Sequence, residues 1–407
     1  MLAELPQTHD LQLANWTEHM SRSVLREMIA IVSRPGITSF AGGLPDHNLF
    51  PVSGYAEAMA HVLATDPKAL QYGPPFVPLK KHIVQLMAQR GVTCAEEQVF
   101  ITTGAQQGLD VLSRLLLNPG GDIFLEEIVY SGVQQVIAPL QPHIFPISTD
   151  LTEGIDVQEI EMQLANGARP AFIYVIPDAH NPLGVSMSQA RREKLVSLAV
   201  KYNIPIIEDD PYGFLQYGAW QQQEADASTH LKPIRSLNES HVIYLGSFSK
   251  ILAPALRLGW MIVPEKLLPK LTVVKEACDL ESSALTQRAV AAFLDMKLLP
   301  SHLDKLRAEY GRRRDAMLEA LYKYFPEEAR WTEPKGGMFI WVELPAEYDT
   351  AALLETAVSE ERVAFIPGHA FAIPGHNIRN CLRLNFSNST VEQIEDGMKR
   401  LAKVINR

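Results

Sequence analysis

The chain has 407 residues, 47% of them hydrophobic and 21% charged, an ordinary globular composition that argues against intrinsic disorder and fibrous repeats. Its 37 Lys and Arg against 47 Asp and Glu give a net charge of −10, which argues against a dedicated nucleic-acid or anionic-membrane binder. Three scattered cysteines without metal-ligand spacing, a non-secretory N-terminus and no long apolar stretch predict a cytoplasmic protein with no metal site.

Short β-branched and aromatic runs alternate with amphipathic stretches from about residue 97 onward. We expect strands at residues 99–102, 122–127, 143–147, 171–177, 204–209, 241–247 and 257–264. Ser188 can cap a helix between the fourth and fifth strands, and Asn203 with Pro205 would end it. This alternation predicts βα units in a mostly parallel sheet with helices on both faces.

The two ends of the chain follow a different pattern. Residues 21–33 are a helix candidate ended by Pro35 and Gly36, and a long charged helix is expected from about Leu298. Strand signals at residues 338–344, 363–368 and 381–386 then indicate a smaller α+β region. We expect a segment at 1–45 that packs with this region, a large domain at 46–297 and a small domain at 298–407.

The most informative chemical feature is SFSKILAPALRLGW, which follows an apolar strand. Lys250 would lie at the strand's C-terminal end, where open α/β sheets bind ligands. Ser247, Ser249 and Arg257 could hold a phosphate while the lysine amine condenses with an aldehyde, a combination that suits pyridoxal 5′-phosphate. Alone, such a string more often marks surface charges beside a turn, so other motifs must decide.

Two further motifs end strands. In IIEDDPYG, Asp209 could keep a cofactor ring nitrogen protonated and Tyr212 could donate to the ring oxygen. In PDAHNPLG, the amide of Asn181 could donate to the same oxygen. Each motif, taken alone, is also typical of a plain turn.

Three more positions complete the set. ITTGAQQG passes from strand to helix at Gly104, so the amides of Ala105 and Gln106 could bind a phosphate, although an ordinary βα turn has the same pattern. Tyr130 follows the next strand and could stack on an aromatic ring, or belong to the core. In CLRLNF, Arg383 lies on the strand face opposite the leucines, where it could bind an anion or be exposed.

Together these motifs resemble the fold-type I, pyridoxal-phosphate-dependent aminotransferases of class I/II, most closely the 2-aminoadipate, kynurenine and aromatic branch. The resemblance covers nearly the whole chain, through SFAGGLP, QYGPP, TTGAQQGL, HNPLG, EDDPYG, SFSK and CLRLNFS. It implies an α/β fold in which a mostly parallel, mixed seven-stranded sheet forms the large cofactor-binding domain. A smaller α+β domain would be built from both chain ends.

The resemblance also implies site roles. Lys250 would be the Schiff-base lysine, Asp209 would bind the pyridinium nitrogen, and Tyr130 would stack on the ring. Asn181 and Tyr212 would bind the ring oxygen. The phosphate would be held by Gly104, Ala105, Gln106, Ser247, Ser249 and Arg257, together with Tyr72 of a second subunit. The substrate would be bound by Arg383, Asn181 and Gly43, and its distal carboxylate by Ser23 and Arg26 of the first helix.

Two positions depart from the family pattern. His180 stands where the family often has glutamine, and Ile128 takes the place of a frequent proline before Tyr130. Neither change removes a cofactor contact, but His180 lies next to the asparagine that would bind the ring. The finer substrate assignment therefore stays open.

The function implied by the resemblance is amino transfer from an L-amino acid (2-aminoadipate, glutamate, aromatic or leucine-like) to a 2-oxo acid, with 2-oxoglutarate as the expected acceptor. The reaction would follow a ping-pong mechanism, and the protein would form a homodimer. A lyase or decarboxylase on the same scaffold would share the cofactor contacts. The effector domain of a GntR-type transcription regulator is a remote alternative. That alternative needs a winged-helix domain of roughly 70 residues, whereas only about forty residues precede SFAGGLP.

Overall fold

The computed structural model describes residues 14–19, 36–217 and 231–407. The helix candidate at 21–33, with Ser23 and Arg26, lies outside the described residues. No helix within the described ranges is both long and apolar enough to cross a membrane.

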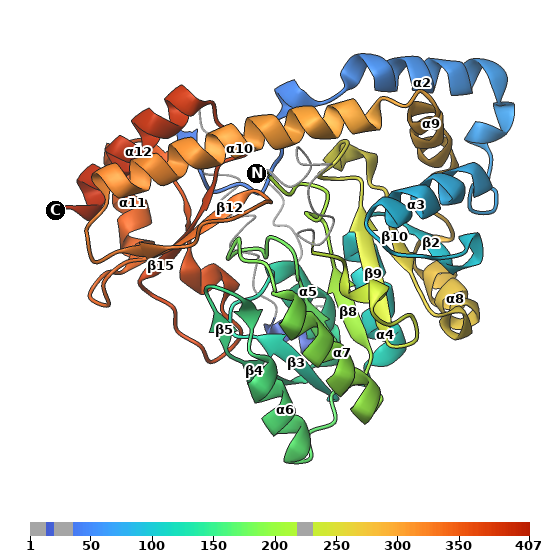
Figure 1. Cartoon of the computed structure of the whole chain (residues 1–407), viewed down its shortest axis with the longest axis horizontal. Coiled ribbons are helices and arrows are strands. Elements are labelled where there is room, and N and C mark those ends of the chain that lie inside the picture. The colour runs from blue at the N-terminus through green and yellow to red at the C-terminus, as the bar shows by residue number, and fades with distance from the viewer. Residues whose placement is uncertain (1–13, 20–35, 218–230) are drawn as a thin grey trace, which may run out of the picture.

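A seven-stranded sheet forms the centre of the larger part of the molecule (Figure 1). All seven expected strands are present, as β2 (Val99–Thr102), β3 (Asp122–Glu126), β4 (His143–Ile147), β7 (Ile173–Val175), β8 (Ile206–Asp209), β9 (Val242–Ser247) and β10 (Gly259–Ile262). Their order is β2-β10-β9-β8-β7-β3-β4, and β10 runs antiparallel to both of its neighbours. The predicted mostly parallel, mixed sheet is confirmed.

Helices cover both faces of this sheet, which explains why its strands are apolar almost throughout. On one face, α4 (Ala105–Leu116), α5 (Ser131–Ile137) and α8 (Leu268–Asp279) pack against strand residues such as Ile123 and Ile207. On the other, α6 (Val157–Ala165) and α7 (Gln189–Tyr202) pack against the alternate residues, such as Phe124 and Ile206. The short hairpin β5 (Thr149–Asp150) and β6 (Gly154–Ile155) precedes α6.

The predicted crossover helix is confirmed as α7. The Ser188 hydroxyl accepts a hydrogen bond from the Arg191 N–H, and Asn203 ends the helix in a left-handed conformation at φ 55°.

The C-terminal region holds a four-stranded sheet of order β11-β12-β15-β14 (Figure 1). Its strands are β11 (Arg330–Trp331), β12 (Phe339–Glu343), β14 (Ile366–Pro367) and β15 (Cys381–Asn385). Its helices are α10 (Leu299–Tyr324), α11 (Thr350–Glu360) and α12 (Val391–Ile405). The long helix and the three strands expected after Leu298 are all present.

Strand β1 (Thr38–Ser39) pairs in parallel with β13 (Val363–Ala364), so the described end of the N-terminal segment joins the C-terminal region. Helices α2 (Val52–Thr65), α3 (Val77–Gln89) and α9 (Ala284–Asp295) lie at the opposite end of the molecule (Figure 1). The domain limits at 45 and 297 stay predictions.

Candidate active site

A cavity of about 260 Å³ opens where the parallel strands end and the C-terminal region approaches the large sheet. Most of the predicted site residues line it, although they come from seven separate segments of the chain. These residues are Gly43, Ala105, Gln106, Tyr130, Asn181, Asp209, Tyr212, Ser247, Ser249, Lys250, Arg257 and Arg383. These residues therefore lie together in the structure although they are spread from position 43 to position 383 of the sequence.

Four predicted residues do not line the cavity as described. Gly104 lies directly before the lining residue Ala105. Tyr72 is 75% exposed and is not among the residues that line the cavity of its own chain. The positions of Ser23 and Arg26 fall outside the described residues.

Lys250 follows β9 and its Nζ donates to the carbonyl oxygen of Gly43 at 2.7 Å. Burial disfavours the ammonium form, and the positive charges of Arg383 and Arg257 repel it, so the pKa of Lys250 falls to about 8. The neutral, nucleophilic form of this amine is therefore far more populated near physiological pH than that of an ordinary lysine, although the ammonium form still predominates below pH 8.

Asp209 is the last residue of β8 and is 5% exposed. Its Oδ2 accepts a hydrogen bond from the Tyr174 hydroxyl at 2.7 Å, whereas its buried Oδ1 has no partner among the described residues. Burial raises the pKa of this carboxyl to about 6, the Tyr174 bond opposes the rise, and the charge of Asp210 adds to it. A buried carboxylate oxygen without a donor is costly, so the site suits a ligand with a cationic N–H.

The opposite end of the cavity is built to receive an anion. Helix α4 begins at Ala105 with no side-chain cap, so its first N–H groups are free to bind a ligand. Gly104 adopts a φ of +84°, and a Cβ there would lie 2.8 Å from Arg257 Nη2. Only glycine allows the guanidinium to approach this turn. The hydroxyl groups of Ser247 and Ser249 line the same cavity.

Arg383 lies in the middle of β15 and is 1% exposed, so the exposed-strand alternative is wrong. Its guanidinium is held between the rings of Phe339 and Phe371, 4.2 and 4.7 Å from their centroids. Nη1 donates to Asn181 Oδ1 at 2.8 Å and Nη2 to the Ala41 carbonyl at 2.7 Å. Burial lowers the pKa of this guanidinium to about 10, which leaves it charged.

Tyr130 also lines the cavity, within electrostatic range of Asp209, Arg257 and Arg383. Its hydroxyl donates to Gln106 Oε1 at 3.2 Å, and Gln106 Nε2 donates to the Gly132 carbonyl at 2.9 Å. A Cβ on Gly132 would lie only 2.2 Å from the Tyr130 ring, so the ring can occupy this position only because residue 132 has no side chain. Burial raises the pKa of Tyr130 to about 12, which keeps the phenol neutral.

The charge balance of the cavity points to an anionic ligand. Lys250, Arg257 and Arg383 all line it, yet no ion pair involves any of the three within the described residues. Asp209 is the one acidic residue of the lining. A ligand that carries a phosphate and a carboxylate would supply the missing negative charge.

The two departures occupy defined positions. His180 is buried, with its Nε2 3.0 Å from Glu126 Oε2, and it acts to lower the pKa of Asp209. Ile128 forms an isolated bridge with Ala372. Neither residue lines the cavity.

Our sequence analysis did not identify three residues that contact the predicted site residues. Tyr174 supports Asp209, while Phe339 and Phe371 enclose Arg383. Their strands were recognised, but an aromatic residue in an apolar strand gives no sign of which neighbour it will contact. The alternation of side chains along AFIYVIP could have placed Tyr174 on the same face as a neighbouring strand's polar residue.

Comparisons with known proteins agree with this geometry. A family model described as aminotransferase class I and II matches residues 38–401. An aromatic-amino-acid aminotransferase of Thermococcus litoralis is 37% identical, over 95% of this chain and 92% of its own length. A solved kynurenine aminotransferase of Pyrococcus horikoshii is 36% identical with a TM-score of 0.89, over 97% of this chain and 96% of its own. An α-aminoadipate aminotransferase of Thermus thermophilus, solved with N-(5′-phosphopyridoxyl)-L-leucine, is 33% identical with a TM-score of 0.87, over 97% of each chain.

Proposed function

Since the chain belongs to the class I and II aminotransferases and uses pyridoxal 5′-phosphate, we propose that it transfers amino groups from dicarboxylic, aromatic or leucine-like L-amino acids to 2-oxoglutarate. The observation that carries this proposal is one cavity that contains both a lysine amine of pKa about 8 and a buried carboxylate oxygen to which no residue in the described ranges donates. The family match supports the enzyme class, and the substrates and the ping-pong order are the proposal.

The residues present fit the cofactor. Asp209 Oδ1, which has no partner among the described residues, would accept from a protonated ring nitrogen. Asn181 and Tyr212 would bind the ring oxygen, and Tyr130 would cover a face of the ring. The α4 N-terminus with Ser247, Ser249 and Arg257 would hold the phosphate.

When bound, pyridoxal 5′-phosphate supplies an aldehyde that takes up amines and a ring that accepts electrons from the substrate. The neutral Lys250 amine is the base that removes the proton from the substrate Cα. Asp209 keeps its negative charge beside the ring nitrogen, and Arg383 binds the substrate α-carboxylate through its guanidinium. The Gly43 carbonyl, which now accepts from Lys250, orients that amine toward the cavity.

The proposed range of donors rests on the relatives and on the predicted helix at 21–33, which lies outside the described residues. The relatives are named for aromatic amino acids, kynurenine and α-aminoadipate. Ser23 and Arg26 are proposed to bind the distal carboxylate of 2-aminoadipate or glutamate. Arg383 has a fixed position between two rings and would serve every donor equally, because every α-amino acid has the same carboxylate.

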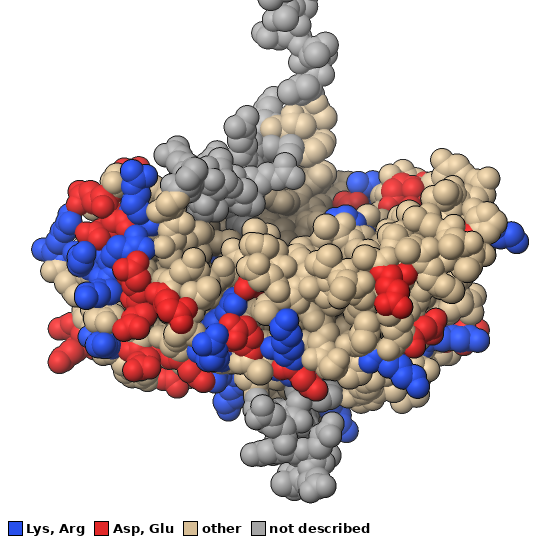
Figure 2. All heavy atoms as spheres, turned by 90° about the horizontal axis from the view of Figure 1, so that it is seen from above, with Lys and Arg blue, Asp and Glu red and all other residues tan. Residues whose placement is uncertain are grey.

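A homodimer is proposed because several large apolar side chains are exposed on the surface between residues 52 and 77. Val52, Leu63, Leu70, Tyr72 and Val77 are each at least 50% exposed. Charged side chains gather over the C-terminal helices, while the surface over α2 carries fewer of them (Figure 2). Tyr72 would cross this interface to the partner's phosphate.

The direct test is a half-reaction with an amino acid and no acceptor. An aminotransferase converts its bound cofactor to the amino form and releases a 2-oxo acid, whereas a lyase or decarboxylase releases other products and returns the aldehyde form. A donor screen with 2-oxoglutarate then ranks the substrates. Failure of every dicarboxylic, aromatic and leucine-like donor would overturn the proposed substrate range.

A further inference from the structure

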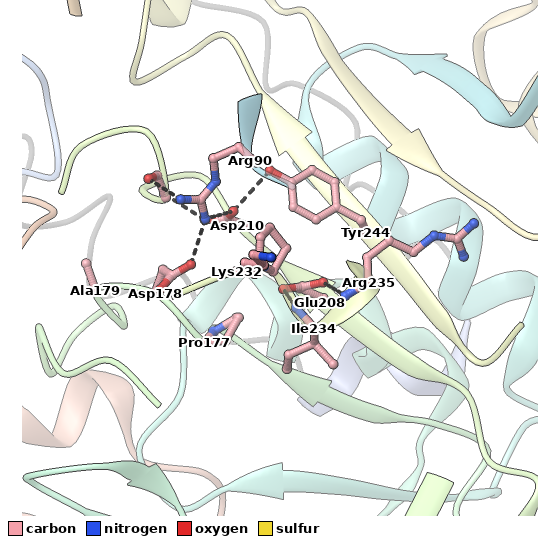
Figure 3. A network of polar contacts seen from close by, with 12 residues as sticks. Arg90, Pro177, Asp178, Ala179, Glu208, Asp210, Lys232, Ile234, Arg235 and Tyr244 are labelled. Atoms are coloured by element: carbon pink, nitrogen blue, oxygen red, sulfur yellow. Dashed lines mark hydrogen bonds and ion pairs between the residues drawn. The ribbon is translucent and has the colours of Figure 1, made fainter. Parts of the chain in front are cut away.

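A buried arginine joins two loops behind the cavity. Arg90, which ends α3, is 6% exposed and comes from a segment that contributes nothing to the lining. Its Nη2 lies 2.8 Å from Asp178 Oδ2 and 3.0 Å from Asp210 Oδ2, and its Nη1 donates to the Gly213 carbonyl at 2.7 Å (Figure 3). One guanidinium therefore has three acceptors.

These three acceptors flank the residues that would hold the cofactor ring. Asp178 lies three positions before Asn181 in the loop after β7. Asp210 follows Asp209, and Gly213 follows Tyr212, in the loop after β8. Arg90 thus fixes the spacing between the loop that carries Asn181 and the loop that carries Asp209 and Tyr212.

Arg90 also provides the positive charge that balances Asp210, one of the two buried acidic neighbours of Asp209. Glu208, Asp209 and Asp210 are consecutive and buried, and alternation along the strand turns Asp209 to the cavity and the other two away from it. Glu208 accepts from the backbone N–H groups of Ile234 and Arg235 (Figure 3), and burial followed by the charge of Asp210 raises its pKa to about 8. Asp210 is balanced by its ion pair with Arg90, with further bonds from Tyr244 Oη and the Gly213 N–H.

Asp178 and Asp210 differ in the hydrogen-bond and ion-pair partners that would remain to them if Arg90 were replaced. Asp178 has a second cation, since Arg192 Nη2 lies 2.7 Å from its Oδ1. Within the described parts of the chain, the donors left to Asp210 would be neutral, namely the Tyr244 hydroxyl and the Gly213 N–H. Loss of Arg90 would therefore act mainly on the loop that begins with Asp209 and ends with Gly213.

We propose that Arg90 is a positioning residue that holds Asn181, Asp209 and Tyr212 at the spacing that receives the cofactor ring. The inference rests on the proposed function of these three residues. A lysine cannot replace Arg90, because one ammonium nitrogen cannot reproduce the two-nitrogen fork that serves three acceptors.

The test compares Arg90→Lys, which keeps the charge, with Arg90→Met, which removes it. Arg235→Lys is the matched control, because Arg235 is 2% exposed and donates to the Glu239 and Val242 carbonyls rather than to the ring-binding loops. For each protein, cofactor is removed and two quantities are measured: the dissociation constant for pyridoxal 5′-phosphate by fluorescence titration, and the thermal midpoint of the apoprotein by circular dichroism.

We expect both Arg90 variants to bind the cofactor about 10- to 100-fold more weakly, the range seen when groups that orient ligands are lost. Arg235→Lys should bind the cofactor with a dissociation constant within about twofold of the wild-type value, even if its thermal midpoint falls as far as those of the Arg90 variants. Equal weakening in all three variants, unchanged affinity in the Arg90 variants, or failure of both Arg90 variants to fold would overturn the positioning role. If the wild type itself does not bind the cofactor, the proposed function fails and not this inference alone.

Discussion

At the residue scale, the site is a small set of charges whose ordinary behaviour is changed by burial. Desolvation disfavours the charged form of both Lys250 and Asp209, so the pKa of the lysine falls to about 8 and that of the carboxyl rises to about 6. Arg383 and Arg257 reinforce the shift of the lysine. The cavity therefore combines an amine whose pKa is lowered with a carboxyl group of which one oxygen, Asp209 Oδ1, has no donor among the described residues.

This electrostatic state predicts how the apoprotein takes up its cofactor. Lys250 attacks the aldehyde as a neutral amine, and because its pKa is lowered to about 8 the neutral fraction grows as pH rises toward that value. The uptake rate should increase about tenfold per pH unit below 8 and level off above it. Stopped-flow absorbance from pH about 6 to about 9.5 measures this. A rate that still climbs steeply at the upper limit would show that Lys250 keeps its ordinary pKa.

Substrate choice is a second prediction at this scale. Arg26→Gln should lower kcat/KM for glutamate and 2-aminoadipate by about 10- to 100-fold, the scale of a lost charged hydrogen bond of about 1.4 to 2.7 kcal/mol, and spare aromatic donors. Arg22→Gln is the matched control, since it removes an equal charge four positions earlier in the same predicted helix, 21–33. Equal losses for both substrate classes would show that Arg26 does not select the distal carboxylate.

At the scale of elements, the turn from β2 into α4 is where we propose that the cofactor phosphate binds. A side chain at Gly104 would have to adopt φ +84° and would press on Arg257. The same turn also presents the free N–H groups of the helix to the cavity. The backbone of this turn and the Arg257 guanidinium therefore depend on each other.

Gly104→Ala should consequently weaken cofactor binding by about tenfold or more, because the guanidinium must move and one charge-assisted contact is worth about 1.5 to 3 kcal/mol. Gly120→Ala is the control, since Gly120 has a similar φ of +73° with nothing within 4 Å of the added Cβ. Both variants should lose a comparable 1 to 2 kcal/mol or so of stability through backbone strain. Equal cofactor affinity in the two variants would contradict the role of this turn.

The elements also show where sequence reasoning succeeds. The seven strands and α7 were predictable because apolar runs, a serine cap and an Asn-Pro stop are local signals. The positions of Asp209, Lys250 and Asn181 followed, since parallel strands end at one edge of the sheet. Arg90 and the two rings around Arg383 were not predictable, because their roles depend on contacts between segments far apart in the chain and no local periodicity encodes them.

At the scale of the whole molecule, the unused apolar surface between residues 52 and 77 matters most. Gly73 N donates to Glu281 Oε2 at 2.9 Å and Phe76 N to Gln287 Oε1 at 2.9 Å, so the loop that bears Tyr72 is held firmly in place. Tyr72 itself stays 75% exposed. A fixed loop with an exposed tyrosine is suited to an isologous contact with a second copy of the chain.

A shared site can be tested by complementation. Lys250→Ala and Tyr72→Phe subunits, each impaired alone, should regain activity when they are mixed, because one site of each heterodimer receives both native residues. Activity should approach about one quarter of the wild type for random mixing. Absence of recovery in a mixture shown to contain heterodimers would place Tyr72 in its own subunit's structure.

The central claim is that Lys250 is the residue that binds the cofactor covalently, and it can be tested by direct chemical labelling. The purified protein is treated with borohydride, digested and mapped by mass spectrometry, with Lys275 as the internal comparison because that buried lysine is paired with Asp279. We predict a pyridoxyl group on Lys250 and none on Lys275. A label on any other lysine, or a protein that takes up the cofactor without a label on Lys250, would contradict the account.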